Sequence, residues 1–246
     1  MTAPFRRLSA SFLATTGNAP ATRRQRHNLP VTTTLAAVLW DMDGTLIDSE
    51  PIWVAQQFVL VEQHAGTWST EQGLALVGAD MHDTAVALQA AGVEMESAEL
   101  VATLERAVID SLRYIVPWRP GVRELLAALR RHDVPCAIAT TSSHEMAELV
   151  ADEAPDGAIS VVVGSEDVTQ TKPSPEPYLR AAELLGVRIE QCVAVEDSPN
   201  GLASAIASGA ATIAVPNDAP LPEAGAFTTW PTLEGRMVAD LAALLR

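Results

Sequence analysis

LWDMDGTLIDSE, at residues 39–50, is the stretch of this 246-residue chain that indicates its fold most directly. The run that leads into it, residues 35–40, is apolar at every position, which is typical of a strand buried on both faces of a parallel sheet. Ligands of such sheets bind beyond the carboxyl ends of the strands, and Asp41 and Asp43 stand at that end. Gly44 then permits a sharp turn of the backbone.

The spacing of Asp41 and Asp43 points to a cation site. Side chains two residues apart in a strand begin on the same face, so the two carboxylates are brought together. Carboxylates forced together repel, and each raises the pKa of the other if neither is paired. A hard divalent cation removes this conflict, and Mg²⁺ usually takes one or two carboxylates together with substrate phosphate. The sequence therefore predicts Mg²⁺ as a cofactor.

Length and composition indicate a globular protein with a sizeable core. A chain of this length suits one large domain or a domain with an insert, and 48% of its residues are hydrophobic. The net charge of −15 argues against a nucleic-acid partner, and no apolar run approaches the ~18–20 residues of a membrane span. Cys136 and Cys192 lack metal-type spacing, which fits a reducing compartment. We therefore expect a cytoplasmic monomer without a membrane partner.

The beginning of the chain differs in composition from the rest. Residues 1–40 contain five arginines and no acidic residue, and the part before residue 35 is rich in Thr, Ala and Pro without helical periodicity. Basic starts of this kind occur in transit peptides. Because no amphipathic helix or apolar signal core is visible, the pattern favours a disordered basic extension over 1–33, or a start site placed too early.

Residues 50–116 have the periodicity of helices, and no convincing alternating strand occurs among them. The pattern predicts a compact helical cap of about four helices over 50–116. Prolines stiffen the segment that follows it. The remainder, 34–49 and 117–246, would then form one catalytic core, interrupted by the cap.

After the cap, strands and helices alternate, which predicts an α/β fold with a doubly wound parallel sheet of five strands. The stretch 221–229, rich in Pro, Ala and Gly, is expected to be a surface loop. The expected strands are 35–40, 135–139, 159–163, 192–195 and 211–215, and the expected helices are 121–131, 145–151, 175–185, one beginning at 199, and 236–245.

Further polar residues follow the predicted strands. Thr140 comes directly after the second strand, with Thr141 as the alternative if that strand ends one residue later. Glu196 and Asp197 come directly after the fourth. Lys172 lies between them and is the only lysine of the chain, among fifteen arginines. A single retained lysine suggests that its compact ammonium is needed, and not the planar fork of arginine.

These residues, in this order, resemble the four motifs of the haloacid dehalogenase superfamily of phosphohydrolases, beginning with DMDGTLIDSE at 41–50. The resemblance covers nearly all of the chain after residue 34. It implies a Rossmann-like core with a helical cap, most similar to the branch of β-phosphoglucomutase and small sugar-phosphate phosphatases. It also implies a small phosphorylated metabolite as the partner of the site.

The resemblance implies a role for each core residue. Asp41 would be the nucleophile that forms an aspartyl-phosphate, and Asp43 would protonate the leaving oxygen and then activate water. Thr140 and Lys172 would bind the phosphoryl oxygens.

For the metal, the resemblance implies a small set of ligands. Mg²⁺ would be held by Asp41, the backbone carbonyl of Asp43 and Asp197, with Glu196 nearby or assisting.

The cap suggests which phosphate ester is used. At the positions where the mutase branch carries an Arg and a His, this chain has Met81 and Trp53, which favours hydrolysis over isomerisation. The cap contains no lysine, so phosphonate hydrolysis through a Schiff base is excluded. Candidate substrate contacts are Trp53, Gln57, Trp68, Gly78, Asp80 and His82 from the cap, and Thr141, Ser142, Ser143 and His144 from the core. Tryptophans in such positions more often belong to the core of the cap, which is the favoured role of Trp53 and Trp68, and a lone histidine such as His82 is more often an exposed polar residue.

Besides a phosphatase of small sugar or polyol phosphates, three other functions share parts of this pattern. The nearest is a phosphohexomutase. A phospho-accepting signalling domain also uses acids, a Thr and a Lys, but an acid/base at Asp43 would hydrolyse the phosphate that it must keep. A non-catalytic binding module is disfavoured because no catalytic position is missing.

Overall fold

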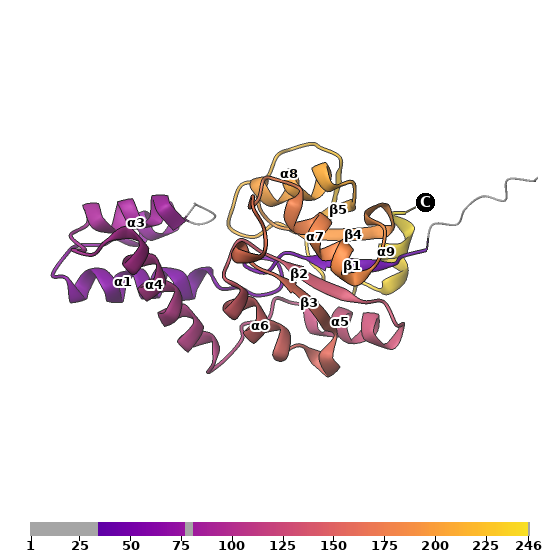
Figure 1. Ribbon diagram of the computed structural model, residues 1–246, viewed down its shortest axis with the longest axis horizontal. Coiled ribbons are helices and arrows are strands. Elements are labelled where there is room, and N and C mark those ends of the chain that lie inside the picture. Colours follow the sequence, from indigo (N-terminus) through magenta and orange to yellow (C-terminus); the bar gives the residue numbers. More distant parts are fainter. Residues whose placement is uncertain (1–33, 77–80, 246) are drawn as a thin grey trace, which may run out of the picture. The chain divides into compact units, whose positions relative to one another are not determined.

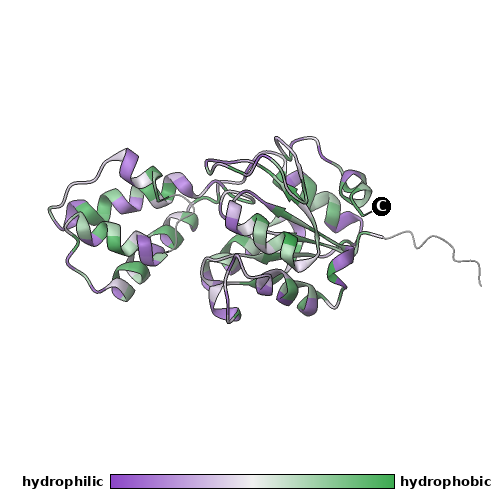
Figure 2. Ribbon diagram, turned by 90° about the horizontal axis from the view of Figure 1, so that it is seen from above, coloured by the Kyte–Doolittle hydropathy of each residue, from purple (hydrophilic) through white to green (hydrophobic). Residues whose placement is uncertain are grey.

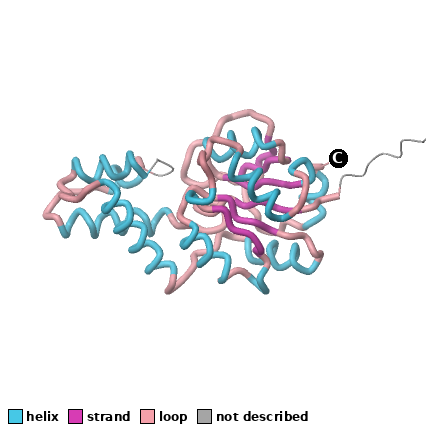
Figure 3. The backbone as a smooth tube through the Cα atoms, viewed as in Figure 1, coloured by secondary structure: helices cyan, strands magenta, loops and turns pink. Residues whose placement is uncertain are grey.

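The computed structural model describes residues 34–76 and 81–245. Their centre is a six-stranded sheet in the order β3-β2-β1-β4-β5-β6, in which every pairing is parallel. Figure 1 labels the elements, and Figure 3 shows the strands as one layer with helices on both sides. The strands are β1 Ala37–Trp40, β2 Cys136–Ala139, β3 Ile159–Val163, β4 Cys192–Glu196, β5 Ala211–Ala214 and β6 Phe227–Thr229.

The prediction of five strands was wrong by one, because β6 lies in the stretch expected to be a loop. Its three residues pair with β5, with Thr212 opposite Phe227 and Ala214 opposite Thr229. Three residues with one apolar side chain are too short to show an alternating pattern. The strand exists because the edge of β5 offers unpaired backbone groups, and these become visible only in the folded sheet.

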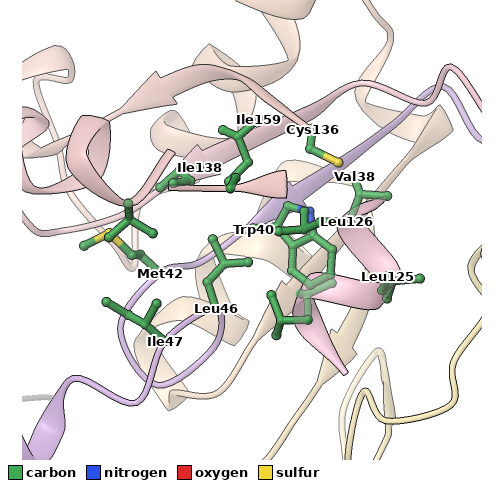
Figure 4. Packing of buried hydrophobic residues seen from close by; sticks show 14 of the residues in the cluster. Val38, Trp40, Met42, Leu46, Ile47, Leu125, Leu126, Cys136, Ile138 and Ile159 are labelled. Atoms are coloured by element: carbon green, nitrogen blue, oxygen red, sulfur yellow. The ribbon is translucent and has the colours of Figure 1, made fainter. Parts of the chain in front are cut away.

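Alternate residues of β1 serve the two faces of the sheet, and this makes the fold doubly wound. Val38 and Trp40 join one hydrophobic cluster, together with residues of α5, α6 and α9. Ala37 and Leu39 join a second cluster, together with residues of α7 and α8. Figure 4 shows Trp40 packed beside Leu125 and Leu126 of α5. The helices are α5 Val122–Arg131, α6 His144–Asp152, α7 Glu176–Leu185, α8 Pro199–Ser208 and α9 Val238–Ala243.

Short 3-10 segments complete the core, at Pro155–Gly157, Ser165–Asp167 and Ile189–Gln191. In Figure 2 the strands carry the colours of apolar residues, whereas polar colours lie mainly on the helices and loops. This agrees with a sheet buried on both faces.

Among the described residues, four helices lie between β1 and α5 and form the predicted helical cap. They are α1 Glu50–Gln63, α2 Thr70–Leu74, α3 Met81–Ala90 and α4 Ser97–Leu112. Leu60, Leu88 and Leu104 belong to a hydrophobic cluster separate from those of the sheet. Division of the chain into cap and core at residues 50 and 116 stays a prediction. The predicted extension over 1–33 lies outside the described residues.

None of the helices formed by the described residues combines the length and apolar character that a membrane crossing requires.

Candidate active site

The loop after β1 is held in place by its own backbone and by a distant arginine. The backbone N–H of Asp41 donates to Val195 O at 3.0 Å, which ties the first acid to β4. Gly44 has φ +78°, and a side chain there would overlap the Asp197 carboxylate, so this position requires glycine. Arg119 donates to the carbonyl oxygens of Gly44 and Pro216, the latter at 2.9 Å. The loop is therefore fixed against the neighbouring strand ends.

Lys172 lies between two of the predicted acids. Its Nζ is 2.5 Å from Asp41 Oδ1 and 2.6 Å from Glu196 Oε1, and all three side chains are buried. Burial alone would lower the pKa of Lys172, but attraction by Asp41 and Glu196 raises it above the ordinary value on balance. The ammonium therefore stays charged and is aimed at the same oxygen cluster as Asp41.

Three carboxylates, from Asp41, Glu196 and Asp197, offer ligand atoms within 4.8 Å of one another. Burial and the neighbouring acids raise the pKa of Asp41 to about 7, although Lys172 opposes them, and raise that of Asp197 to about 9. Asp41 Oδ2 is buried without a hydrogen-bond partner among the described residues.

The charges of this cluster fit a divalent cation. If all three carboxylates were ionised, they and the Lys172 ammonium would leave two negative charges in a buried place. Uncompensated buried charge is costly, and a cation of charge +2 would balance it. The atoms that could bind the metal are all carboxylate oxygens, and Mg²⁺ prefers oxygen ligands.

The carboxylate of Asp43 does not join this cluster. Ser49 Oγ donates to its Oδ1 at 2.5 Å, Ser142 Oγ donates to its Oδ2 at 2.6 Å, and Trp53 Nε1 approaches Oδ1 at 3.4 Å. These partners come from the loop after β1, the loop after β2 and helix α1 of the cap. The carboxylate is thus oriented by core and cap together, and metal binding by its backbone carbonyl stays a prediction.

The residues that follow β2 have two roles, since one supports the backbone through hydrogen bonds and the next two line a cavity. Thr140 is buried, donates its N–H to Val163 O at 3.0 Å and accepts the Ser142 N–H at 3.1 Å through Oγ1. Thr141 and Ser142 line the cavity in front of the acids. The predicted strand end was correct, since β2 ends at Ala139 and Thr140 follows it directly.

A cavity of about 410 Å³ lies before the acids and is lined from both core and cap. Its acidic wall includes Asp41, Asp43 and Asp197, and its cap wall includes Trp53 and Gln57. The cavity is thus large enough for a small ligand and reaches the reacting groups.

Other candidates from the cap are placed differently. His82 is exposed on α3, and the described lining residues do not include it, whereas its neighbour Met81 does line the cavity. Gly78 and Asp80 lie outside the described residues. On the core side, His144 pairs with Asp167 at 2.5 Å rather than lining the cavity.

The family follows from a comparison with known sequences. The profile of the family described as haloacid dehalogenase-like hydrolase matches residues 38–215, a span that includes Asp41, Thr140, Lys172 and Asp197. This chain belongs to that family.

Relatives of this haloacid dehalogenase-like hydrolase include phosphatases. Hexitol phosphatase A of Escherichia coli strain K12 is 34% identical over 191 residues, covering 74% of this chain and 84% of that enzyme. Pyrophosphatase PpaX of Bacillus cereus strain AH820 is 28% identical over 180 residues, covering 72% and 82%. Together with the family match, these relatives make the chain a phosphatase of this family.

A solved structure shares the fold. A variant of CbbY from Rhodobacter sphaeroides, crystallised with xylulose-(1,5)bisphosphate, has a TM-score of 0.74 at 23% identity, covering 85% of this chain and 99% of that chain. At this identity the likeness extends to the fold alone.

Three residues that shape the hydrolase site were missed by the sequence analysis. Tyr178 of α7 is fully buried and donates its hydroxyl to Glu196 Oε1 at 2.6 Å, the same oxygen that Lys172 contacts. A side chain at Gly201 would overlap the Glu196 carboxylate. The chain holds only two tyrosines, and one at a core-facing position of the helix after Lys172 was a usable signal.

Glu50 is the third. It lines the cavity and is nearly buried, and burial together with the charge of Asp43 raises its pKa to about 8. It lay inside the first motif but was given no chemical role, because its burial depends on the cap.

Proposed function

We propose that this phosphatase hydrolyses small sugar or polyol phosphates through an aspartyl-phosphate on Asp41, with Mg²⁺ as its cofactor. The observation that carries the proposal is the state of the Asp41 carboxylate. One oxygen is paired with Lys172 at 2.5 Å, and the other is buried without a hydrogen-bond partner among the described residues, in a side chain that lines the cavity. A carboxylate in the wall of a ligand cavity that has one oxygen without a hydrogen bond is suited to attack phosphorus.

The first half of the reaction uses Asp41 and Asp43. An oxygen of Asp41 forms a bond to phosphorus while the bond from phosphorus to the alkoxide oxygen breaks. Asp43 donates a proton to that oxygen, which leaves as an alcohol. Because Ser49 and Ser142 hold both oxygens of the Asp43 carboxylate, the donor keeps one orientation.

The second half restores the enzyme. Asp43, now ionised, accepts a proton from water, whose oxygen attacks phosphorus and displaces the Asp41 carboxylate. Lys172 faces the phosphoryl oxygens, and its positive charge stabilises the negative charge that develops on them in the transition state. Thr141, which lines the cavity, can donate to the same oxygens, whereas the Ser142 hydroxyl is already used by Asp43.

The acids of the cluster have separate tasks in this proposal. Both oxygens of Glu196 already accept hydrogen bonds, Oε1 from Lys172 and Tyr178 and Oε2 from the backbone of Asp197. Glu196 therefore holds Lys172 in place and assists the metal site without being one of its proposed ligands. Mg²⁺, when bound by Asp41, Asp197 and the Asp43 carbonyl, would keep the carboxylates ionised and draw charge from the phosphoryl oxygens.

The substrate class is supported by the relatives and by the cavity. Hexitol phosphatase A has the highest identity of the two relatives described above. Among the described lining residues Lys172 is the one cation, whereas a mutase that binds a bisphosphate needs a second basic group. The monomeric state, the lack of nucleic-acid and membrane partners and the cytoplasmic location stay predictions.

A screen of phosphorylated metabolites, with and without EDTA, tests the function. We expect release of phosphate from hexitol or sugar phosphates and its loss in EDTA. Asp41→Asn should abolish turnover, whereas Asp48→Asn, an exposed aspartate of the same motif, should not. Substantial turnover by Asp41→Asn would refute the nucleophile. Conversion of a sugar phosphate to its isomer, dependent on added bisphosphate, would favour the mutase instead.

A further inference from the structure

Glu105 of α4 is a cap residue that contacts the loop after β2. Its Oε1 accepts the backbone N–H of Ser143 at 3.1 Å, and the residue lines the cavity that contains Asp41. Ser143 directly precedes α6, so the contact lies at the N-terminal end of that helix, where negative charge is favoured. The carboxylate of Glu105 is therefore held in a defined position in the wall of the cavity.

This position lies on the side of the cavity that receives the leaving part of a substrate. Ser142, the neighbour of Ser143, donates to Asp43 Oδ2 at 2.6 Å. In the proposed reaction Asp43 protonates the leaving oxygen, so the alcohol part of the ester begins at Asp43. Two adjacent residues thus hold Asp43 and Glu105. The part of the substrate beyond the leaving oxygen extends into space that Glu105 borders.

Among the residues that the structure describes, the cap wall of the cavity contains no cation that could offset Glu105. Lys172, the one cation of the described lining, is paired with two acids of the core. Residues 77–80, V-G-A-D, contain no basic side chain. Glu50, at the start of α1, also lines the cavity and adds no positive charge. A negatively charged group on the leaving part of a substrate would therefore be repelled without compensation.

We propose that Glu105 is a specificity-determining residue that disfavours phosphate esters with a second anionic group and so selects monophosphates whose remaining part is neutral. The inference rests on the proposed function, because it assumes that the ester is hydrolysed at Asp41 with Asp43 as the acid. It adds which property of the leaving part is read and which side chain of the cap reads it.

The test compares two phosphate esters that differ at the end remote from phosphorus. Sorbitol 6-phosphate ends in a hydroxymethyl group, whereas 6-phosphogluconate has the same carbon chain and ends in a carboxylate. The measured quantity is the ratio of kcat/KM for the first ester to kcat/KM for the second. The wild type should favour the sorbitol ester. Glycerol 3-phosphate and 3-phosphoglycerate differ in the same way and give a second ratio for shorter esters.

Glu105→Gln should lower this ratio roughly tenfold, as expected on removal of one of two like charges about 10 Å apart at an effective dielectric constant of about 20. The change should come from a higher kcat/KM for the carboxylate ester. Glu105→Ala separates charge from hydrogen bonding, because glutamine can still accept the Ser143 N–H and alanine cannot. Both variants should lower the ratio by a similar factor, and if one of them unfolds, the other gives the result.

Glu99→Gln is the matched control, because Glu99 is exposed on the same helix, is not among the described lining residues and changes the net charge equally. Its ratio should equal that of the wild type. The proposal is overturned if the wild type has no preference for the neutral esters, if the folded Glu105 variants keep the wild-type ratio, or if the control lowers it as much. If the wild type hydrolyses no phosphate ester, the proposed function fails, and that outcome is distinct from an unchanged ratio.

Discussion

Replacement of Tyr178 by phenylalanine isolates a single buried hydrogen bond of the site. The Tyr178 hydroxyl donates to Glu196 Oε1 at 2.6 Å, and the residue is completely buried. Its ring lies 5.2 Å from Lys172 Nζ, and a phenylalanine ring would keep that contact. The substitution therefore removes one donor from a buried carboxylate while the packing of α7 stays the same.

The expected loss follows from the charge of the acceptor. Hydrogen bonds to charged groups contribute roughly 1.5–3 kcal/mol to stability. Glu196 Oε1 retains the Lys172 ammonium at 2.6 Å, so it is not left wholly unpaired. The free energy of unfolding should fall by about 1.5–3 kcal/mol. For a domain of this size, each kcal/mol lowers Tm by about 2–4 °C, so the melting temperature should fall by about 3–12 °C.

Urea unfolding measures this loss as a shift in the midpoint at an unchanged m-value. Tyr114, the second tyrosine of the chain, is 92% exposed, so Tyr114→Phe is the matched control and should unfold like the wild type. A loss below about 0.5 kcal/mol, the range of ordinary surface substitutions, would refute the role given to this hydrogen bond. A loss of similar size in the control would refute it too.

Three further predictions concern neighbouring features. Lys172→Met should lower kcat by a factor of about 10²–10³, as loss of an oxyanion donor does; near wild-type turnover in steady-state assays would contradict it. Gly201→Ala should lower the free energy of unfolding in urea by about 1–3 kcal/mol, because its methyl group overlaps Glu196; wild-type stability would show that the carboxylate moves aside. Asp167 raises the pKa of His144, so Asp167→Asn should lower that pKa in an NMR titration. Because the pKa of His144 is raised in the folded state, the pair stabilises the fold fully only below the unfolded pKa of about 6.5. This contribution to stability is lost as the pH rises through the folded pKa. An unchanged His144 titration in Asp167→Asn would contradict the pairing.

Much of the fold was predictable because its signals are local. An apolar run that ends in two aspartates and a glycine identified β1 and the loop behind it, and the structure has the strand at Ala37–Trp40. The helix signals of α8 were correct in detail, since Ser198 accepts the Gly201 N–H and Pro199 follows it. The short edge strand β6 was missed, because only the free edge of β5 selects those residues.

Some residues of the site also had local sequence signals, and others had none. Sequence order and residue type identified Asp41, Lys172 and Asp197 as members of one site, and the structure brings them together. Partners that act from a distance were not identifiable, since Tyr178 and Arg119 carry no motif of their own. Their importance comes from which oxygen each one reaches.

By itself, the sequence determined the alternation of strands and helices, the acids at the strand ends and the family, because each depends on neighbouring residues or fixed spacing. Only the tertiary structure decided that Glu196 holds Lys172 and that Ser49 and Ser142 hold Asp43. These are matters of distance between segments far apart in the chain. Hydrogen bonding and burial act over a few ångströms, and no local pattern encodes which distant groups will come that close.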